Sequence, residues 1–305
     1  MSDRILSLKY TSTGNYHIEK GIECQDHVAT FEDDDIFIAV LCDGIGSLEN
    51  DSLSAEITCQ SVITCLYNYS LSFPVETIAE SVVDYAQTRL FEEAEKAGIS
   101  PDSMGCTVAF AAIRKKKEEA VIGCLGDSAV CVLGNSGSRT YTGYSAGNVT
   151  CSIMDQDAAT SMVMDKLSLE DGKVSGVILC SDGLENEIYV KGSTAVLKPA
   201  EDYFNRFDSE EDGLKFMEER ISLLKQENGR GYDDDISIIL VRLQDGELCL
   251  PDEPNWLCSC GNRNPLQQTY CGKCGKDFSI VYKGIRFRDY DDKRSYFLAE
   301  NRENK

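Results

Sequence analysis

Aspartates stand where several apolar runs of this chain end. Three runs finish as Cys42-Asp43-Gly44, Gly126-Asp127-Ser128 and Ser181-Asp182-Gly183, and a fourth run is preceded by Asp233-Asp234-Asp235. A single Asp-Gly pair is usually an ordinary turn, but carboxylates at the ends of several core strands can meet in space. Their mutual repulsion makes such a cluster costly unless cations occupy it. The pattern therefore predicts a metal site built from carboxylates.

Oxygen ligands, in a chain with only 2 histidines, favour Mg²⁺ or Mn²⁺ over softer metals. A centre of two such ions, about 3.5–4 Å apart, lowers the pKa of a bridging water and holds a phosphoryl group for in-line attack. Hydrolysis of a phosphate ester is the chemistry that this set of residues predicts.

The elements that position these aspartates are strands mixed with paired helices. Apolar periodicity predicts strands at Ile5–Thr11, Asp26–Phe31, Ile36–Cys42, Thr107–Arg114, Glu119–Leu125, Ala129–Leu133, Val177–Cys180 and Ile236–Leu243. Helical spacing predicts helices at Ser52–Tyr69, Pro74–Gly98 and Ser209–Gln226. Residues 134–175 are rich in Gly, Ser, Thr and Asp and are interpreted as a flap or mixed loop region. This order favours a layered α+β domain over regular βαβ winding.

The order and spacing of six motifs resemble the metal-dependent protein phosphatase 2C (PPM) family. The motifs are Cys24-Gln25-Asp26, Cys42-Asp43-Gly44-Ile45-Gly46, Met104-Gly105-Cys106-Thr107, Gly126-Asp127-Ser128, Ser181-Asp182-Gly183 and Asp234-Asp235-Ile236-Ser237. The resemblance covers residues 5–243 and is greatest to compact bacterial members. It implies a four-layer αββα sandwich, with the metal site at one end, and a serine/threonine phosphoprotein phosphatase.

The resemblance also implies roles for individual residues. Asp43 would bridge two Mn²⁺ or Mg²⁺ ions, the carbonyl of Gly44 would bind one of them, and Asp182 and Asp234 would hold the other. Asp43, Asp182 and Asp234 are thus the expected catalytic residues, and the attacking group would be metal-bound water and not a serine or threonine.

Two further acids belong to this expected metal site. Asp127 would help to hold a third, weaker metal found in bacterial relatives, and Asp26 would act directly on a metal or through another ligand. Many family members have Glu-Asp where this chain has Gln25-Asp26. Glutamine is familiar in the bacterial branch, and it removes one negative charge.

The phosphate-binding residue of the family has no direct counterpart here. The arginine of the family falls on Gly21, and the histidine that follows Asp-Gly in animal members is Ile45. His17 and Lys20 are the residues that could replace them in binding phosphate, although either could equally be an ordinary loop residue.

Composition limits the classes of partner. The chain has 305 residues and a net charge of −22, and because residues 251–305 hold ten basic and eight acidic residues, residues 1–250 carry −24. Such a surface repels nucleic acids and anionic lipid. No apolar run approaches the length of a membrane span or a signal peptide. Ten of the 14 cysteines are scattered through residues 1–250, several of them, such as Cys42, Cys124 and Cys180, inside apolar runs. We therefore expect a cytoplasmic protein.

Four cysteines near the end of the chain have the spacing of a zinc site. Cys258 and Cys260 form C-x-C, and Cys271 and Cys274 form C-x-x-C ten residues later. Four thiolates of this kind close a structural, tetrahedral Zn²⁺ site, and in so small a module the metal supplies most of the folding energy. The module resembles zinc ribbons, which most often bind proteins.

The expected domains are a catalytic domain at 1–245, a linker at 246–254, the zinc ribbon at 255–280 and a C-terminal tail at 281–305. The tail could pack on either domain or bind a partner.

Two functions remain open at this point. In the first, the chain is an active phosphatase that acts on a phosphorylated protein, and its zinc module recruits a substrate or a partner kinase. In the second, it is an inactive scaffold of phosphatase fold that binds signalling partners. The four aspartates at 43, 127, 182 and 234 favour the first function, because a scaffold gains little from a repelling acid cluster. Nucleic-acid binding through the ribbon is disfavoured by the acidic charge of residues 1–250.

Overall fold

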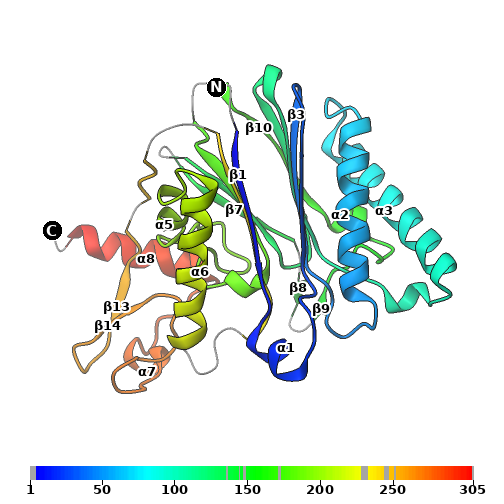
Figure 1. Cartoon of the computed structure of the whole chain (residues 1–305). Helices are drawn as coiled ribbons and strands as arrows, with labels where there is room; N and C mark the ends of the chain where they lie inside the picture. Colours follow the sequence, from blue (N-terminus) through cyan, green and yellow to red (C-terminus); the bar gives the residue numbers. More distant parts are fainter. Residues whose placement is uncertain are drawn as a thin grey trace.

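The computed structural model describes residues 5–134, 137–143, 145–146, 149–170, 173–227, 233–243, 247–250 and 252–303. Two antiparallel five-stranded sheets form its centre (Figure 1). The first sheet has the order β1 (Leu6–Ser12), β12 (Ile236–Arg242), β11 (Gly176–Cys180), β6 (Ala129–Leu133) and β7 (Arg139–Thr142). The second has the order β10 (Val163–Ser168), β5 (Glu119–Leu125), β4 (Val108–Arg114), β3 (Ile36–Cys42) and β2 (His27–Glu32).

Helices cover the outer face of each sheet, as Figure 1 shows. The second sheet is covered by α2 (Asp51–Asn68), α3 (Val75–Ala97) and α4 (Ala158–Ser161). The first sheet is covered by α5 (Ala200–Asn205) and α6 (Glu210–Glu227). These layers confirm the predicted αββα sandwich.

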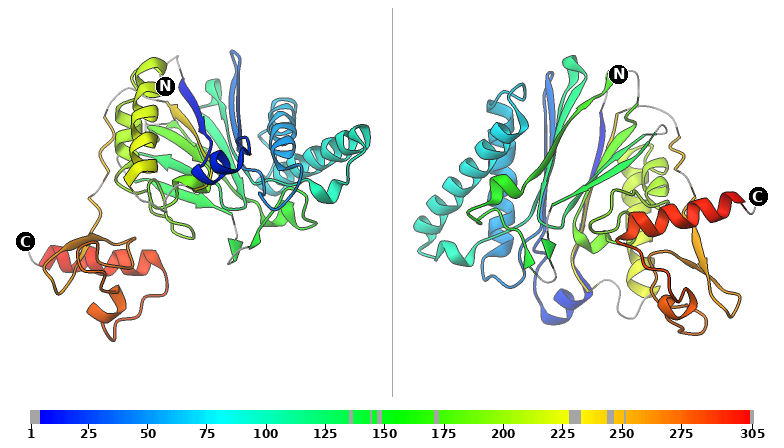
Figure 2. Two further views of the ribbon diagram at one scale, coloured as in Figure 1. Left: turned by 60° about the horizontal axis from the view of Figure 1, so that its bottom comes forward. Right: turned by 180° about the vertical axis from the view of Figure 1, so that it is seen from behind.

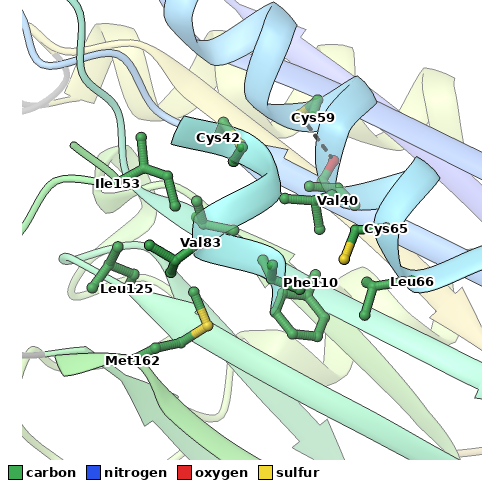
Figure 3. Packing of buried hydrophobic residues seen from close by; sticks show 14 of the residues in the cluster. Val40, Cys42, Cys59, Cys65, Leu66, Val83, Phe110, Leu125, Ile153 and Met162 are labelled. Carbon is green, nitrogen blue, oxygen red and sulfur yellow. Dashed lines mark hydrogen bonds between the residues drawn. The ribbon is translucent and has the colours of Figure 1, made fainter. Parts of the chain in front are cut away.

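Strand β3 shows why the layers form. All seven of its residues are buried, and since successive side chains of a strand point to opposite faces, they divide between two cores. Phe37, Ala39 and Leu41 pack between the sheets. Val40 and Cys42 point toward the helices, where Figure 3 shows them close to residues of α2 and α3. The prediction of a strand buried on both faces is confirmed.

The cysteines of the two sheets behave as small apolar residues. Cys42, Cys124 and Cys180 are buried and form no disulfide. In α2, Cys59 Sγ lies 3.7 Å from the carbonyl oxygen of Val40 (Figure 3). Loss of hydration raises the pKa of Cys124, so its thiol stays protonated. Core packing is therefore the role of these residues.

Several short elements were not predicted. The loop after β1 contains a helix, α1 (Asn15–Lys20), and residues 134–175, interpreted as a flap or mixed loop, contain strands as well as a helix. The elements in this region are β7, β10 and α4, named above, together with β8 (Ser145–Ala146) and β9 (Val149–Thr150). Among the described residues, 3₁₀ helices lie at Pro101–Ser103, Lys115–Lys117 and Asp182–Leu184.

The C-terminal residues form a separate small unit beside the first sheet, as both views of Figure 2 show. It consists of β13 (Asn255–Leu257), β14 (Arg263–Pro265), α7 (Phe278–Val281) and α8 (Tyr290–Glu303). Its core joins Trp256, Cys258, Leu266 and Cys271 to Phe297 of α8, so the predicted tail packs on the zinc ribbon. We refer to residues 252–303 as the C-terminal unit. None of the helices in the described ranges is apolar and long enough to span a bilayer.

Candidate metal centre

A pocket of about 390 Å³ opens at the end of the sheets where α1 lies, at the bottom of Figure 1. It brings together four of the predicted metal ligands, Asp43, Asp127, Asp182 and Asp234, and the backbone of Gly44. Five further residues that line it were not assigned a role from the sequence: Tyr16, Thr107, Thr150, Gly46 and Asp233. The expected convergence of acids from separate strands is therefore seen in this structure.

Hydrogen bonds between its backbone and Thr107 hold Asp43 in place at the end of β3. Its N–H donates to Thr107 Oγ1 over 3.1 Å, and the N–H of Thr107 donates to the carbonyl oxygen of Asp43 over 2.8 Å. The Thr107 hydroxyl also lies 2.7 Å from that of Ser128, which directly follows Asp127. Three of the sequence motifs thus meet in one hydrogen-bonded chain at the edge of the pocket.

The first sheet supplies Asp182 and Asp234 in a similar way. The N–H of Ser181 donates to the carbonyl oxygen of Ser237 over 3.0 Å, and the N–H of Ser237 donates to Ser181 Oγ over 2.9 Å. A side chain at Gly183 would place its Cβ 2.1 Å from the carbonyl oxygen of Asp235. Only glycine therefore allows the two acid-bearing loops to approach so closely.

Asp235, which belongs to one of the sequence motifs but was assigned no role, holds α1 at the pocket. It is buried and accepts three hydrogen bonds, from the N–H of Gly14, from the N–H of Gln25 and from Nδ1 of His17, over 2.7, 2.6 and 2.9 Å. His17 lines the pocket, and one of its ring nitrogens is already used in the hydrogen bond to Asp235. Lys20 lies outside the pocket lining, with its ammonium 5.7 Å from the centre of the Tyr16 ring.

Gln25 supports the same wall. Its Nε2 donates to Asp51 Oδ2 over 2.5 Å at the start of α2, and its carbonyl oxygen accepts the N–H of Gly44 over 3.2 Å. The side chain of Gln25 thus binds Asp51, in addition to the bond of its backbone N–H to Asp235. Its carbonyl oxygen orients the backbone of the expected ligand Gly44.

Asp26 and Asp182 have buried oxygens that lack a donor. The side chains of Ser237, Asp43 and Ser181 lie near Asp26 and partly offset the rise in its pKa that loss of hydration causes. Within the described part of the chain, however, no donor has hydrogen-bond geometry to either oxygen of Asp26 or to Oδ1 of Asp182. Loss of hydration is the main cause that raises the pKa of each carboxyl to about 7, and neighbouring aspartates raise it further. Buried acceptors without donors are costly, and bound divalent cations would remove that cost.

The acids around Asp43 act on one another. Loss of hydration raises its pKa far above the ordinary value, and the charges of four other aspartates, Asp26, Asp182, Asp234 and Asp127, raise it further. No three acids among the described residues have donor atoms all within 4.8 Å of one another. The acids of the pocket are therefore less closely grouped than the four cysteines of the C-terminal unit.

Asp127 already has a cationic partner. Its Oδ2 lies 2.9 Å from Nζ of Lys191 and accepts the hydroxyl of Thr150 over 2.7 Å. Lys191 has no neighbouring motif in the sequence, so no local signal predicted its position here.

The four predicted zinc ligands converge in the C-terminal unit. The sulfurs of Cys258, Cys260, Cys271 and Cys274 all lie within 4.8 Å of one another, with Cys258 to Cys274 and Cys260 to Cys271 each 3.6 Å apart. Sulfurs 2.3 Å from a tetrahedral Zn²⁺ are about 3.8 Å apart. The cluster therefore has the size that zinc requires.

Comparison with protein families gives a match to the family model described as Protein phosphatase 2C over residues 13–231. A comparison with curated proteins found no match. Among solved structures, a bacterial serine phosphatase is 14% identical, with a TM-score of 0.58 over 80% of this chain and all of that one.

Two further solved structures share the fold. The serine/threonine phosphatase Stp1 from Staphylococcus aureus is 16% identical, with a TM-score of 0.57 over 79% of this chain and 96% of its own. RsbX, solved in complex with magnesium, is 18% identical, with a TM-score of 0.52 over 80% of this chain and 98% of its own. At these sequence identities the solved structures show a shared fold and nothing more. The match to the family model over residues 13–231 shows that the chain belongs to that family.

Proposed function

We propose a reaction for this chain, which belongs to the protein phosphatase 2C family and is a phosphoprotein phosphatase. The reaction is hydrolysis of phosphoserine and phosphothreonine through two divalent cations in this pocket. The family depends on Mn²⁺ or Mg²⁺, and the proposed ligands are Asp43, the Gly44 carbonyl, Asp182, Asp234 and, directly or through another ligand, Asp26. Such ions supply activated water and neutralise phosphoryl oxygens.

The observation that carries this proposal is the set of buried oxygens on Asp26 and Asp182 without donors. Within a stable fold, buried polar atoms are normally satisfied by protein or bound solvent. These oxygens belong to carboxylates whose pKa values are raised by loss of hydration and by other nearby aspartates, and a cation is the group that attracts several carboxylates at once. An acidic pocket would also repel a phosphate dianion unless cations were bound first.

The residues around the acids have positioning roles in this scheme. Thr107 positions Asp43 because its hydroxyl accepts a hydrogen bond from the N–H of Asp43 and its own N–H donates to the carbonyl oxygen of Asp43. Asp235 holds α1, and with it His17, at the pocket wall. His17 stays the proposed phosphate contact, through its other ring nitrogen, and Lys20 is the less favoured one because it lies outside the pocket lining.

We assign the C-terminal unit to recruitment of a protein. Leu257, Tyr270 and Ile280 expose between 51% and 64% of their surfaces, and such apolar side chains on a small module favour contact with a protein. A phosphorylated substrate or a partner serine/threonine kinase is the proposed occupant. The unpaired core cysteines support a reducing compartment such as the cytoplasm.

Turnover of an aryl phosphate and a phosphothreonine peptide, with and without Mn²⁺, tests the proposal. We expect activity only with Mn²⁺, and Asp182→Asn should lower it by about 10²-fold or more because a metal ligand is lost. Asp208→Asn, which changes a surface acid paired with Arg242, is the matched control and should keep full activity. Absence of turnover by a folded, Mn²⁺-loaded wild-type chain would contradict the proposal and favour the inactive scaffold.

A further inference from the structure

Lys191 places a fixed positive charge inside the acid cluster. Its ammonium lies 2.9 Å from Asp127 Oδ2. Its charge also partly offsets the rise in the pKa of Asp182, which loss of hydration and the neighbouring aspartates cause. Asp127 is 6% exposed, and the Lys191 side chain is 30% exposed. This is therefore a half-buried ion pair, of which Asp127 lines the pocket, and not a contact between two exposed surface side chains.

The segment that carries Lys191 is built around Asp127. The hydroxyl of Tyr189, which is fully buried, donates to the carbonyl oxygen of Asp127 over 2.7 Å. The N–H of Lys191 donates to Glu185 Oε1 over 3.2 Å, and the N–H of Glu185 donates to the carbonyl oxygen of Asp182 over 2.8 Å. Both ends of the segment are thus tied to expected metal ligands, which fixes the path of the lysine.

One oxygen of the Asp127 carboxylate is already used, so a metal would have to bind the other oxygen beside the lysine charge. The used oxygen, Oδ2, accepts the ammonium of Lys191 and the hydroxyl of Thr150. A divalent ion that used this carboxylate would lie beside a like charge, and repulsion in a half-buried site is only weakly screened. The residues present therefore do not fit a third ion at Asp127, in contrast to the fit of Asp26 and Asp182.

We infer that the Lys191 ammonium takes the place of a third divalent cation at Asp127, so that the pocket binds two divalent ions and no more. The inference rests on the proposed two-ion centre and adds a statement about its stoichiometry. Lys191 neutralises Asp127 permanently, whereas a weakly bound ion would do so only at high metal concentration.

Counting Mn²⁺ per chain by equilibrium dialysis and elemental analysis tests the inference without any need for turnover. Zinc is measured in the same samples, so the C-terminal site is counted separately. At millimolar Mn²⁺ the wild-type chain should bind two ions, and Lys191→Met should bind three. Lys191→Arg, which keeps the charge, should bind two, and the double variant Asp127→Asn with Lys191→Met should lose the additional ion.

Lys198→Met is the matched control, because Lys198 forms an equally short ion pair, 2.7 Å to Glu201, outside the pocket. It should leave the count at two. Three ions in the wild-type chain, or no gain in a folded Lys191→Met chain, would overturn the inference. If circular dichroism shows that Lys191→Met does not fold, the number of Mn²⁺ ions bound by the wild-type chain alone tests the inference. Fewer than two ions in the wild-type chain would instead contradict the proposed two-ion centre.

Discussion

Asp26 lies behind the residues that line the pocket and is a costly buried acid in the absence of cations. It is 8% exposed, neither of its oxygens accepts a hydrogen bond among the described residues, and its pKa is raised to about 7 by loss of hydration and by the charge of Asp235. The pKa in the folded state lies above the ordinary value of 3.8, so the folded chain binds the proton more tightly than the unfolded chain. Stability should therefore fall as the pH rises between about 4 and 7.

We predict that Asp26→Asn removes this pH dependence when Mn²⁺ and Mg²⁺ are absent. Between pH 5.5 and 8, the free energy of unfolding of the wild-type chain should fall relative to the variant by about 2 kcal/mol. Urea unfolding at the two pH values measures the difference. Saturating Mn²⁺ should reverse it, because only the wild-type chain keeps that ligand. A difference that does not change with pH would show that Asp26 is ionised throughout.

At the residue scale, the sequence predicted which aspartates meet at the pocket, but it did not predict the contacts that support them. Asp43 and Asp182 follow apolar strands, and that local pattern is visible in the sequence. Asp235 and Asp234 are adjacent and chemically identical, yet Asp235 is buried and Asp234 is exposed at the pocket. Lys191 reaches Asp127 across 64 positions. Only the folded chain shows these long-range contacts.

At the scale of elements, long periodic segments were predictable and short ones were not. Strand β3 and helices α2, α3 and α6 follow from periodicity because burial repeats along them. Helix α1 has only six residues, and such short helices are unstable alone. It ends at Gly21, with φ of +68°, and is held by Asp235. Its stability therefore depends on a residue more than 200 positions away.

The C-terminal unit is an element of the fold whose core depends on both halves of its sequence. The aromatic rings of Trp256 and Phe278 meet edge to face at 5.3 Å, and Phe278 contacts Phe297 of α8 at 6.2 Å. This core crosses residue 280, where the sequence suggested that the ribbon ends. Cys258 and Cys271 are part of the same core, so zinc binding and aromatic packing should form together.

We predict that Cys271→Ser abolishes zinc binding and unfolds this unit while the two large sheets stay folded. Trp256 is the single tryptophan of the chain and is fully buried, so its fluorescence reports on the unit alone. Its emission should shift to the red, and zinc content should fall by about one ion per chain. Cys249→Ser, outside the cluster of four, is the control. An unshifted spectrum in a zinc-free variant would show that aromatic packing suffices.

At the scale of the whole molecule, Asp291 of α8 joins the C-terminal unit to the segment beside the pocket. It accepts the hydroxyl of Ser193 over 2.6 Å and the N–H of Thr194 over 3.0 Å. Ser193 lies two residues from Lys191, which contacts Asp127. A continuous series of contacts therefore links the unit that we assign to recruitment with the wall of the metal pocket, although two folded states of this link would be needed for allosteric control.

We predict that Asp291→Ala loosens this segment without unfolding either part of the molecule. A hydrogen bond to a charged acceptor contributes about 1.5–3 kcal/mol, so exchange of the Thr194 amide hydrogen should accelerate by about tenfold or more. Hydrogen exchange measured by NMR resolves this amide. Asp292→Ala is the matched control, because among the described residues the Asp292 carboxylate contacts Arg288 of the same unit. Equal exchange in both variants would mean that Asp291 does not hold the segment, and Cys271→Ser should then leave it unchanged as well.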